Sequence, residues 1–268
     1  MAIKSKQASS PTMQNHVISL TTATERRQHI AEEFSKQNIV FEFFDAITPP
    51  CIDTVAKQFG IDISKMNLSS GEIACFLSHL CLWQKAIDDD LDWIAIFEDD
   101  IYLGNNAQAF LICDDWLPNG FDVIKLETFA TSVHLSDPKT VQDRQLYTLN
   151  TAHYGAGGYI ISKRCIVALF ELIKYQSQHQ AQISAIDDIL FAQILNKKDV
   201  LQLTPALCIQ EFIHKQGNLS LKSTLDEHRQ THYFKKPHRT LPQKIMREFN
   251  SFIHKTRLKI FGQVVEFK

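Results

Sequence analysis

Residues 93–100, WIAIFEDD, join an uninterrupted apolar run to three consecutive acidic side chains. An apolar run without polar alternation is typical of a central strand that is covered on both faces, as in an open α/β sheet. Ligands of such sheets bind outside the carboxyl ends of the strands. The sequence therefore predicts that Glu98, Asp99 and Asp100 lie where a ligand arrives.

The acidic triplet is a candidate cation site. Three carboxylates at one strand end repel one another and raise one another's pKa unless a cation neutralises them. Their oxygens favour Mn²⁺ or Mg²⁺, ions that also hold a diphosphate. A solvated acidic loop is the alternative, and we assign it to the acidic stretch at 88–92, because only the triplet directly follows the apolar run.

Hydrophobic periodicity predicts further elements of the same fold. We expect strands at 16–20, 39–44, 122–126, 157–162 and 200–204, the last closing the sheet. We expect helices at 22–37, 69–89, 165–174 and 185–195. Capping boxes of Thr22 with Glu25 and of Ser69 with Glu72 should begin the first two. The initial strand, helix and strand indicate a nucleotide-binding α/β domain.

Composition narrows the class of protein. The 268 residues are 44% hydrophobic, enough for one sizeable domain, and a net charge of −2 gives no nucleic-acid signature. The six cysteines form no CxxC pair, which indicates reduced thiols of a cytoplasmic protein. No apolar run approaches the length of a membrane span. The polar residues 1–12 are interpreted as a leader or tag.

The end of the chain, 233–268, is basic and amphipathic. From position 235 onward the sequence has nine Lys or Arg residues and only two acidic residues, Glu248 and Glu266. Aromatic and aliphatic side chains alternate with the basic ones. Such a segment fits an anionic membrane surface. A terminal helix packed back on the body is the alternative.

Other residues carry weaker signals. Glu72 and His79 project from one side of the helix at 69–89, with Ser78 on a neighbouring stripe, although spacing alone favours a helix cap at Glu72 and an ordinary hydrogen bond at His79. Small residues at 154–158, including Gly157, allow a close ligand approach or a tight turn. The carboxylates at the starts or ends of other elements are candidate bases or helix-dipole partners, namely Asp187, Asp188 and Glu127.

Six blocks of the sequence resemble glycosyltransferase family 25, in the expected order across residues 14–222. They are HVISL (16–20) with the Glu25-Arg26-Arg27 run, LSSGEIACFLSHLCLW (68–83), IAIFEDDIYL (94–103), VIKLET (123–128), YGAGGYIIS (154–162) and IDDILF (186–191). That family includes lipooligosaccharide galactosyl- and glucosyltransferases of Gram-negative bacteria.

The resemblance implies a GT-A-like domain over residues 13–232. It also implies that this domain transfers a hexose, with galactose favoured over glucose, from a UDP-sugar to a lipooligosaccharide or lipopolysaccharide core. The transfer would invert the configuration at the anomeric carbon. The resemblance further implies manganese, with Mg²⁺ as the alternative, held by Asp100 and Glu98, although the usual motif reads Asp-any-Asp. The donor contacts that it implies are Ser19, Leu20, Arg26, Arg27, Glu72, Ser78, His79, Asp99 and Gly157. Asp187 becomes the candidate base, with Asp188 and Glu127 as rivals. The enzyme would lie on the cytoplasmic side of the inner membrane, as a peripheral protein.

Two other classes of function compete. A nucleotidyltransferase or metal-dependent phosphohydrolase also places carboxylates at a strand end, but the loop after the first strand, TTATERR, lacks the glycines that nucleotidyltransferases usually carry there. A membrane-associated scaffold with inert carboxylates is the non-enzymatic alternative, and it predicts no metal-dependent binding of UDP.

Overall fold

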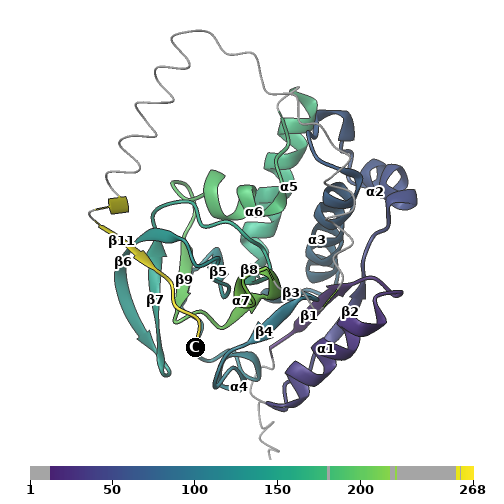
Figure 1. Ribbon diagram of the computed structural model, residues 1–268. Helices are drawn as coiled ribbons and strands as arrows, with labels where there is room; N and C mark the ends of the chain where they lie inside the picture. The colour runs from purple at the N-terminus through teal and green to yellow at the C-terminus, as the bar shows by residue number, and fades with distance from the viewer. Residues whose placement is uncertain (1–12, 180–181, 218–220, 222–257, 260) are drawn as a thin grey trace, which may run out of the picture.

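The computed structural model describes residues 13–179, 182–217, 221, 258–259 and 261–268, which form a mixed α/β fold around one large sheet (Figure 1). In spatial order its strands are β11 (Gly262–Val264), β6 (Ser132–Val141), β7 (Arg144–Leu149), β9 (Val200–Thr204), β5 (Val123–Lys125), β8 (Gly158–Ser162), β3 (Trp93–Glu98), β1 (Asn15–Ser19) and β2 (Glu42–Asp45). Strands β4 (Ile101–Leu103) and β10 (Cys208–Gln210) form a separate antiparallel pair. The predicted α/β class with a mixed central sheet is confirmed.

Helices cover both faces of the sheet. They are α1 (Thr24–Ser35), α2 (Ile52–Gln58), α3 (Ser70–Asp88), α4 (Gln108–Leu111), α5 (Lys163–Gln178), α6 (Ile186–Asp188) and α7 (Glu211–His214), with short turns η1 (Pro49–Cys51), η2 (Ile63–Lys65) and the π-helical η3 (Ile189–Gln193). One core lies under α3 and α5, and a second lies under α1 and α4.

Strand β3 is the central strand that its apolar run predicts. It runs parallel to β1 and antiparallel to β8. Ile94 and Ile96 belong to the core under α3, whereas Ala95 and Phe97 belong to the core under α1, and all four are fully buried. The period of two along a strand explains this division. The acidic residues therefore emerge where the buried strand ends.

One of the two predicted capping boxes is present. Ser69 caps α3, because its hydroxyl accepts a bond from the Glu72 backbone amide while the Glu72 carboxylate accepts one from the Ser69 amide. The predicted box of Thr22 with Glu25 is wrong. Helix α1 begins at Thr24, so its cap position falls on Ala23, whose side chain cannot accept a hydrogen bond.

Strand β9 does not close the sheet, which corrects the expectation for residues 200–204. The β6–β7 hairpin adds to β9 on its outer side, and β11 adds to β6. Polar and charged residues occupy the solvent face of β6, so its sequence lacks the apolar run that marks the inner strands. The predicted helix at 185–195 is present in part, as α6 followed by the π-helical turn η3.

The basic segment 233–268 lies largely outside the described residues, and residues 1–12, interpreted as a leader or tag, lie wholly outside them. The described end of the basic segment has helical residues at 258–259 and 261, followed by strand β11, which pairs with β6 on the body. Val265 is buried, and its carbonyl accepts a hydrogen bond of 2.7 Å from the Thr128 hydroxyl. Among the described helices, none combines the length and apolar character needed to cross a bilayer.

Candidate active site

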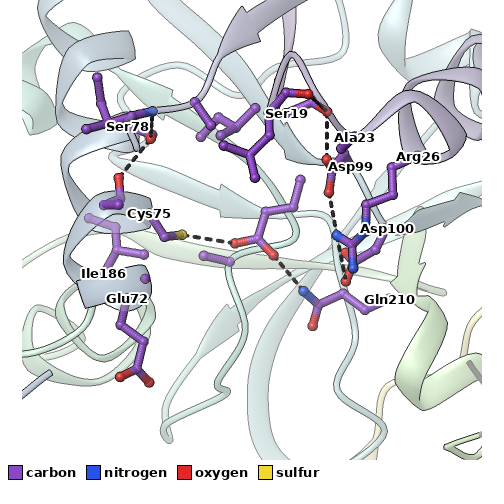
Figure 2. A pocket seen from close by; sticks show the side chains of 18 of the residues that line it. Ser19, Ala23, Arg26, Glu72, Cys75, Ser78, Asp99, Asp100, Ile186 and Gln210 are labelled. Atoms are coloured by element: carbon purple, nitrogen blue, oxygen red, sulfur yellow. Dashed lines mark hydrogen bonds and ion pairs between the residues drawn. The ribbon is translucent and has the colours of Figure 1, made fainter. Parts of the chain in front are cut away.

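A cavity of about 680 Å³ opens at the carboxyl ends of β1 and β3. Figure 2 shows Glu72, Cys75 and Ser78 of α3 on one side, and Ser19, Arg26, Asp99 and Asp100 on the other. Short segments from distant parts of the chain complete the lining, at 46–49, 155–156, 185–187 and 210–212. The volume lies within the range of small-molecule sites, and the location at strand ends is where open α/β sheets bind ligands.

Asp99 connects the first strand to the first helix. One of its carboxylate oxygens accepts a bond of 2.7 Å from the Ser19 hydroxyl, and the other accepts one of 2.6 Å from Arg26. The Arg26 guanidinium also lies 3.9 Å from Asp100. Burial disfavours the charge on Arg26, but Asp99 and Asp100 outweigh that effect and raise its pKa. A fixed positive charge thus lies in the cavity wall.

Asp100 is a cavity-lining carboxylate whose two oxygens are not both paired. Its Oδ1 atom is buried and has no hydrogen-bond partner. Burial and the neighbouring charge of Glu98 raise its pKa to about 8. A buried oxygen without a partner costs free energy, and a divalent cation would remove both that cost and the repulsion.

Glu98 is held from three directions. Gln210 donates to its Oε2 atom at 2.6 Å, and the Cys75 thiol approaches its Oε1 atom at 3.7 Å. His79 Nε2 also lies 3.7 Å from Oε1. Although burial works in the opposite direction, the contact with His79 and the charge of Arg26 lower the pKa of Glu98.

His79 lies behind the cavity wall rather than in it. It is fully buried, and its Nδ1 atom lies 2.8 Å from the Tyr159 hydroxyl. The same hydroxyl accepts a bond of 3.1 Å from Trp83 Nε1. His79 Nε2 faces Glu98. His79 therefore contacts a cavity carboxylate and not the cavity space.

Asp187 and Asp188 differ in their access to the cavity. Asp187 lines the cavity, where its two carboxylate oxygens accept bonds from the backbone amides of Gly155 (3.1 Å) and Asp188 (2.9 Å). These bonds fix the carboxylate and leave further acceptor capacity. Asp188 is not among the described lining residues, and its carboxylate accepts a bond from Gln193 at 2.8 Å.

Glu127 and Gly157 lie beneath the cavity. Glu127 is fully buried and accepts bonds from Lys125 Nζ (3.1 Å) and the Gly157 amide (2.9 Å). Burial raises its pKa, with the charge of Lys125 opposing the shift. A Cβ atom at Gly157 would lie 2.9 Å from Glu127 Oε1 and from Gln210 Cγ. Close packing, not ligand approach, accounts for this glycine.

Of the remaining predicted donor contacts, some line the cavity and one lies behind its wall. Leu20, Glu72 and Ser78 line the cavity. The Ser78 hydroxyl accepts a bond from the Ile47 amide at 2.9 Å and so connects α3 to the lining segment that follows β2. Arg27 does not line the cavity. Its guanidinium donates instead to the Leu20 and Ser19 carbonyls and to Asp45.

Sequence reasoning missed Cys75, Gln210 and Phe212. Cys75 follows Glu72 by three residues and precedes His79 by four, so helical spacing could have placed it between them. Gln210 ends strand β10, and only the pairing of β10 with β4 brings it to Glu98. No local pattern in the sequence signals that pairing.

The fold and the site together define an α/β protein with a carboxylate-lined ligand cavity at its strand ends. The sequence profile of glycosyltransferase family 25 (LPS biosynthesis protein) matches residues 12–190. The chain belongs to this family and is a glycosyltransferase.

Similar proteins come from Gram-negative bacteria. A putative glycosyltransferase of Haemophilus influenzae is 40% identical over 95% of this chain and 88% of its own length. The lipooligosaccharide biosynthesis protein lic2B of Haemophilus influenzae is 37% identical over 87% of this chain and 93% of its own length. The lacto-N-neotetraose biosynthesis glycosyltransferase LgtE of Neisseria gonorrhoeae is 39% identical over 80% and 79%.

Proposed function

We propose that this chain transfers a hexose from a UDP-sugar to the core of a lipooligosaccharide or lipopolysaccharide, with galactose favoured over glucose as the hexose. The transfer inverts the configuration at the anomeric carbon and requires a divalent cation. The supporting observation is the buried, unpartnered Oδ1 atom of Asp100 in a cavity at the carboxyl ends of the strands. The names of the relatives support the choice of acceptor. The domain would then be of the GT-A type.

The residues present fit a hard cation. Asp100 supplies the free oxygen and Glu98 the second carboxylate, and oxygen ligands of this kind suit Mn²⁺ or Mg²⁺. When bound, the ion would act as a Lewis acid toward the charge on the diphosphate. Arg26 lies 3.9 Å from Asp100 and adds a positive charge from the protein itself.

Asp187 is the proposed catalytic base. The acceptor oxygen attacks the anomeric carbon on the face opposite the nucleotide, the bond to UDP breaks, and Asp187 takes the proton of the hydroxyl. Asp187 is favoured over Asp188 and Glu127 because its carboxylate is accessible from the cavity. Asp187 lines the cavity, whereas Asp188 is engaged with Gln193 and Glu127 is enclosed with Lys125.

The other residues of the cavity bind and position the donor. Ser19, Leu20 and Arg26 lie where β1 gives way to α1, which is the nucleotide side of the proposed complex. Asp99 holds Ser19 and Arg26 together, and Glu72 and Ser78 shape the α3 wall. Arg27, His79 and Gly157 act through neighbours, since each supports a lining segment from behind.

We also propose a location for the enzyme. It would act on the cytoplasmic face of the inner membrane, where its donor and its glycolipid acceptor meet. The basic residues from 235 onward would attract it to anionic lipid, since each basic side chain near such a surface contributes about 1 kcal/mol. This segment lies mostly outside the described residues.

Calorimetric titration of UDP with and without Mn²⁺ tests the proposal. We expect metal-dependent binding to the wild-type protein and its loss in Asp100→Asn. Asp53→Asn is the matched control, because Asp53 is an exposed carboxylate on α2 outside the cavity lining. An inert scaffold predicts no metal-dependent heat. Equal metal-dependent binding by the wild-type protein and Asp100→Asn would overturn the assignment of the metal site.

A further inference from the structure

Phe212 stands apart from the other exposed apolar side chains. Eight large hydrophobic residues are exposed among the described part of the chain, and Phe212 alone of these lines the cavity. Its side chain is 57% exposed although it borders a site rich in carboxylates. Ligand pockets are commonly lined by aromatic side chains together with a small number of polar groups.

The ring is carried by a well-anchored element. Phe212 lies on α7, where the Glu211 amide donates a bond of 2.8 Å to the Asp100 carbonyl. The buried Glu211 carboxylate accepts bonds of 2.9 Å from Lys215 and from the Leu221 amide. Phe212 is therefore fixed relative to the acidic motif, and a ligand that contacts it need not order the backbone first.

The surroundings of Phe212 suit a sugar ring. A hexose presents hydroxyl groups around its edge and C–H bonds on its faces, so it requires both polar partners and an apolar surface. The cavity supplies the Asp187 carboxylate, which the proposed function assigns to the acceptor hydroxyl, together with the Phe212 ring. A nucleotide base also stacks on aromatic rings, but the nucleotide side of the proposed complex is the β1–α1 junction, whereas Phe212 comes from the β10–α7 junction.

Figure 2 shows the β10 end of the cavity through Gln210, which lies across from Glu72 and Cys75 of α3. Phe212 follows Gln210 by two residues and belongs to the same lining segment. From these observations we infer that Phe212 is the stacking platform for the acceptor sugar, which receives the hexose with one ring face against this side chain. The inference rests on the proposed function and adds the acceptor subsite to it.

Steady-state transfer to glucose-terminated and galactose-terminated core oligosaccharides tests this role. In Phe212→Ala the KM for the acceptor should rise about tenfold, because an aromatic stack is lost. Phe212→Tyr should restore the acceptor KM to within about twofold of the wild-type value. The affinity for UDP with Mn²⁺, measured by calorimetry, should stay within about twofold in both variants.

Tyr175→Ala is the matched control, since Tyr175 is an aromatic residue with 59% exposure on α5 and is not among the cavity-lining residues. It should leave the acceptor KM and the UDP affinity unchanged. Thermal melting of each variant reports folding independently of activity.

The possible results distinguish a failure of the Phe212 platform from a failure of the proposed function. An unchanged acceptor KM in Phe212→Ala refutes the platform, and a fall in UDP affinity assigns the ring to the nucleotide instead. A Phe212→Tyr variant as impaired as Phe212→Ala also contradicts stacking. A wild-type protein that neither binds UDP nor transfers a sugar overturns the proposed function and this inference with it.

Discussion

Replacing Asp100 by Asn should make the metal-free protein more stable while it abolishes transfer. Burial and the charge of Glu98 raise the pKa of Asp100 to about 8, so ionising this carboxyl opposes folding. Such a cost is absent below the ordinary aspartate pKa, grows as the pH rises, and is complete above pH 8. Asparagine keeps the shape and removes the charge.

The size of the effect follows from the pKa. About 3 pH units separate the ordinary aspartate pKa from pH 7, and each is worth about 1.4 kcal/mol, which sets a ceiling of about 4 kcal/mol at pH 7. The Asp100 side chain is 22% exposed, so water lowers the cost. We expect Asp100→Asn to gain about 2 kcal/mol in the free energy of unfolding at pH 7, and less at pH 5.

Urea unfolding in EDTA at pH 5, 7 and 8 measures this gain. Asp53→Asn, at an exposed position on α2, is the control and should show no comparable gain. Added Mn²⁺ should stabilise the wild-type protein and not the Asp100→Asn variant, because only a ligand of the folded state shifts the equilibrium. A variant that is less stable than the wild type at every pH would refute the reasoning.

Three further predictions concern the base, a buried histidine and a packed glycine. Asp187→Asn should lower kcat for transfer by about 10²- to 10⁴-fold, while calorimetry shows UDP affinity within about twofold; near-normal kcat would remove Asp187 from the mechanism. Burial lowers the pKa of His153 to about 3, so its neutral form stabilises the fold above pH 6.5, and about 1.4 kcal/mol of unfolding free energy is lost by pH 5.5. Urea unfolding of His153→Gln should show a shallower dependence on pH over this window than the wild type, and an identical slope would contradict the assignment. Gly157→Ala should destabilise the protein by about 1–3 kcal/mol, because the new Cβ atom would lie 2.9 Å from Glu127 and Gln210; an unchanged urea midpoint would show that the neighbours move freely.

The parts of the fold that were predictable are those with local signals. The apolar run of β3 specified a strand covered on both faces, and Ser69 with Glu72 specified the start of α3. The β6–β7 hairpin was not predictable in this way, because its outer strands show polar residues to solvent. Its place in the sheet depends on pairing with β9, a contact distant in sequence.

The candidate site shows the same division between local and tertiary information. Strand ends and helix starts located Asp100 and Asp187, because carboxylates at such positions collect on one edge of an α/β sheet. Sequence could not tell that Arg27 turns to the Ser19 and Leu20 carbonyls while Arg26 faces the acidic motif. Gln210 reaches Glu98 only through the β4–β10 pair.

The most direct test is a crystal soaked with UDP and Mn²⁺, measured for anomalous scattering from manganese. We predict a peak at coordination distance from Asp100, with the diphosphate bound to the same ion inside the cavity. Manganese absent from the cavity, with Asp100 and Glu98 remote from the bound nucleotide, would contradict the account.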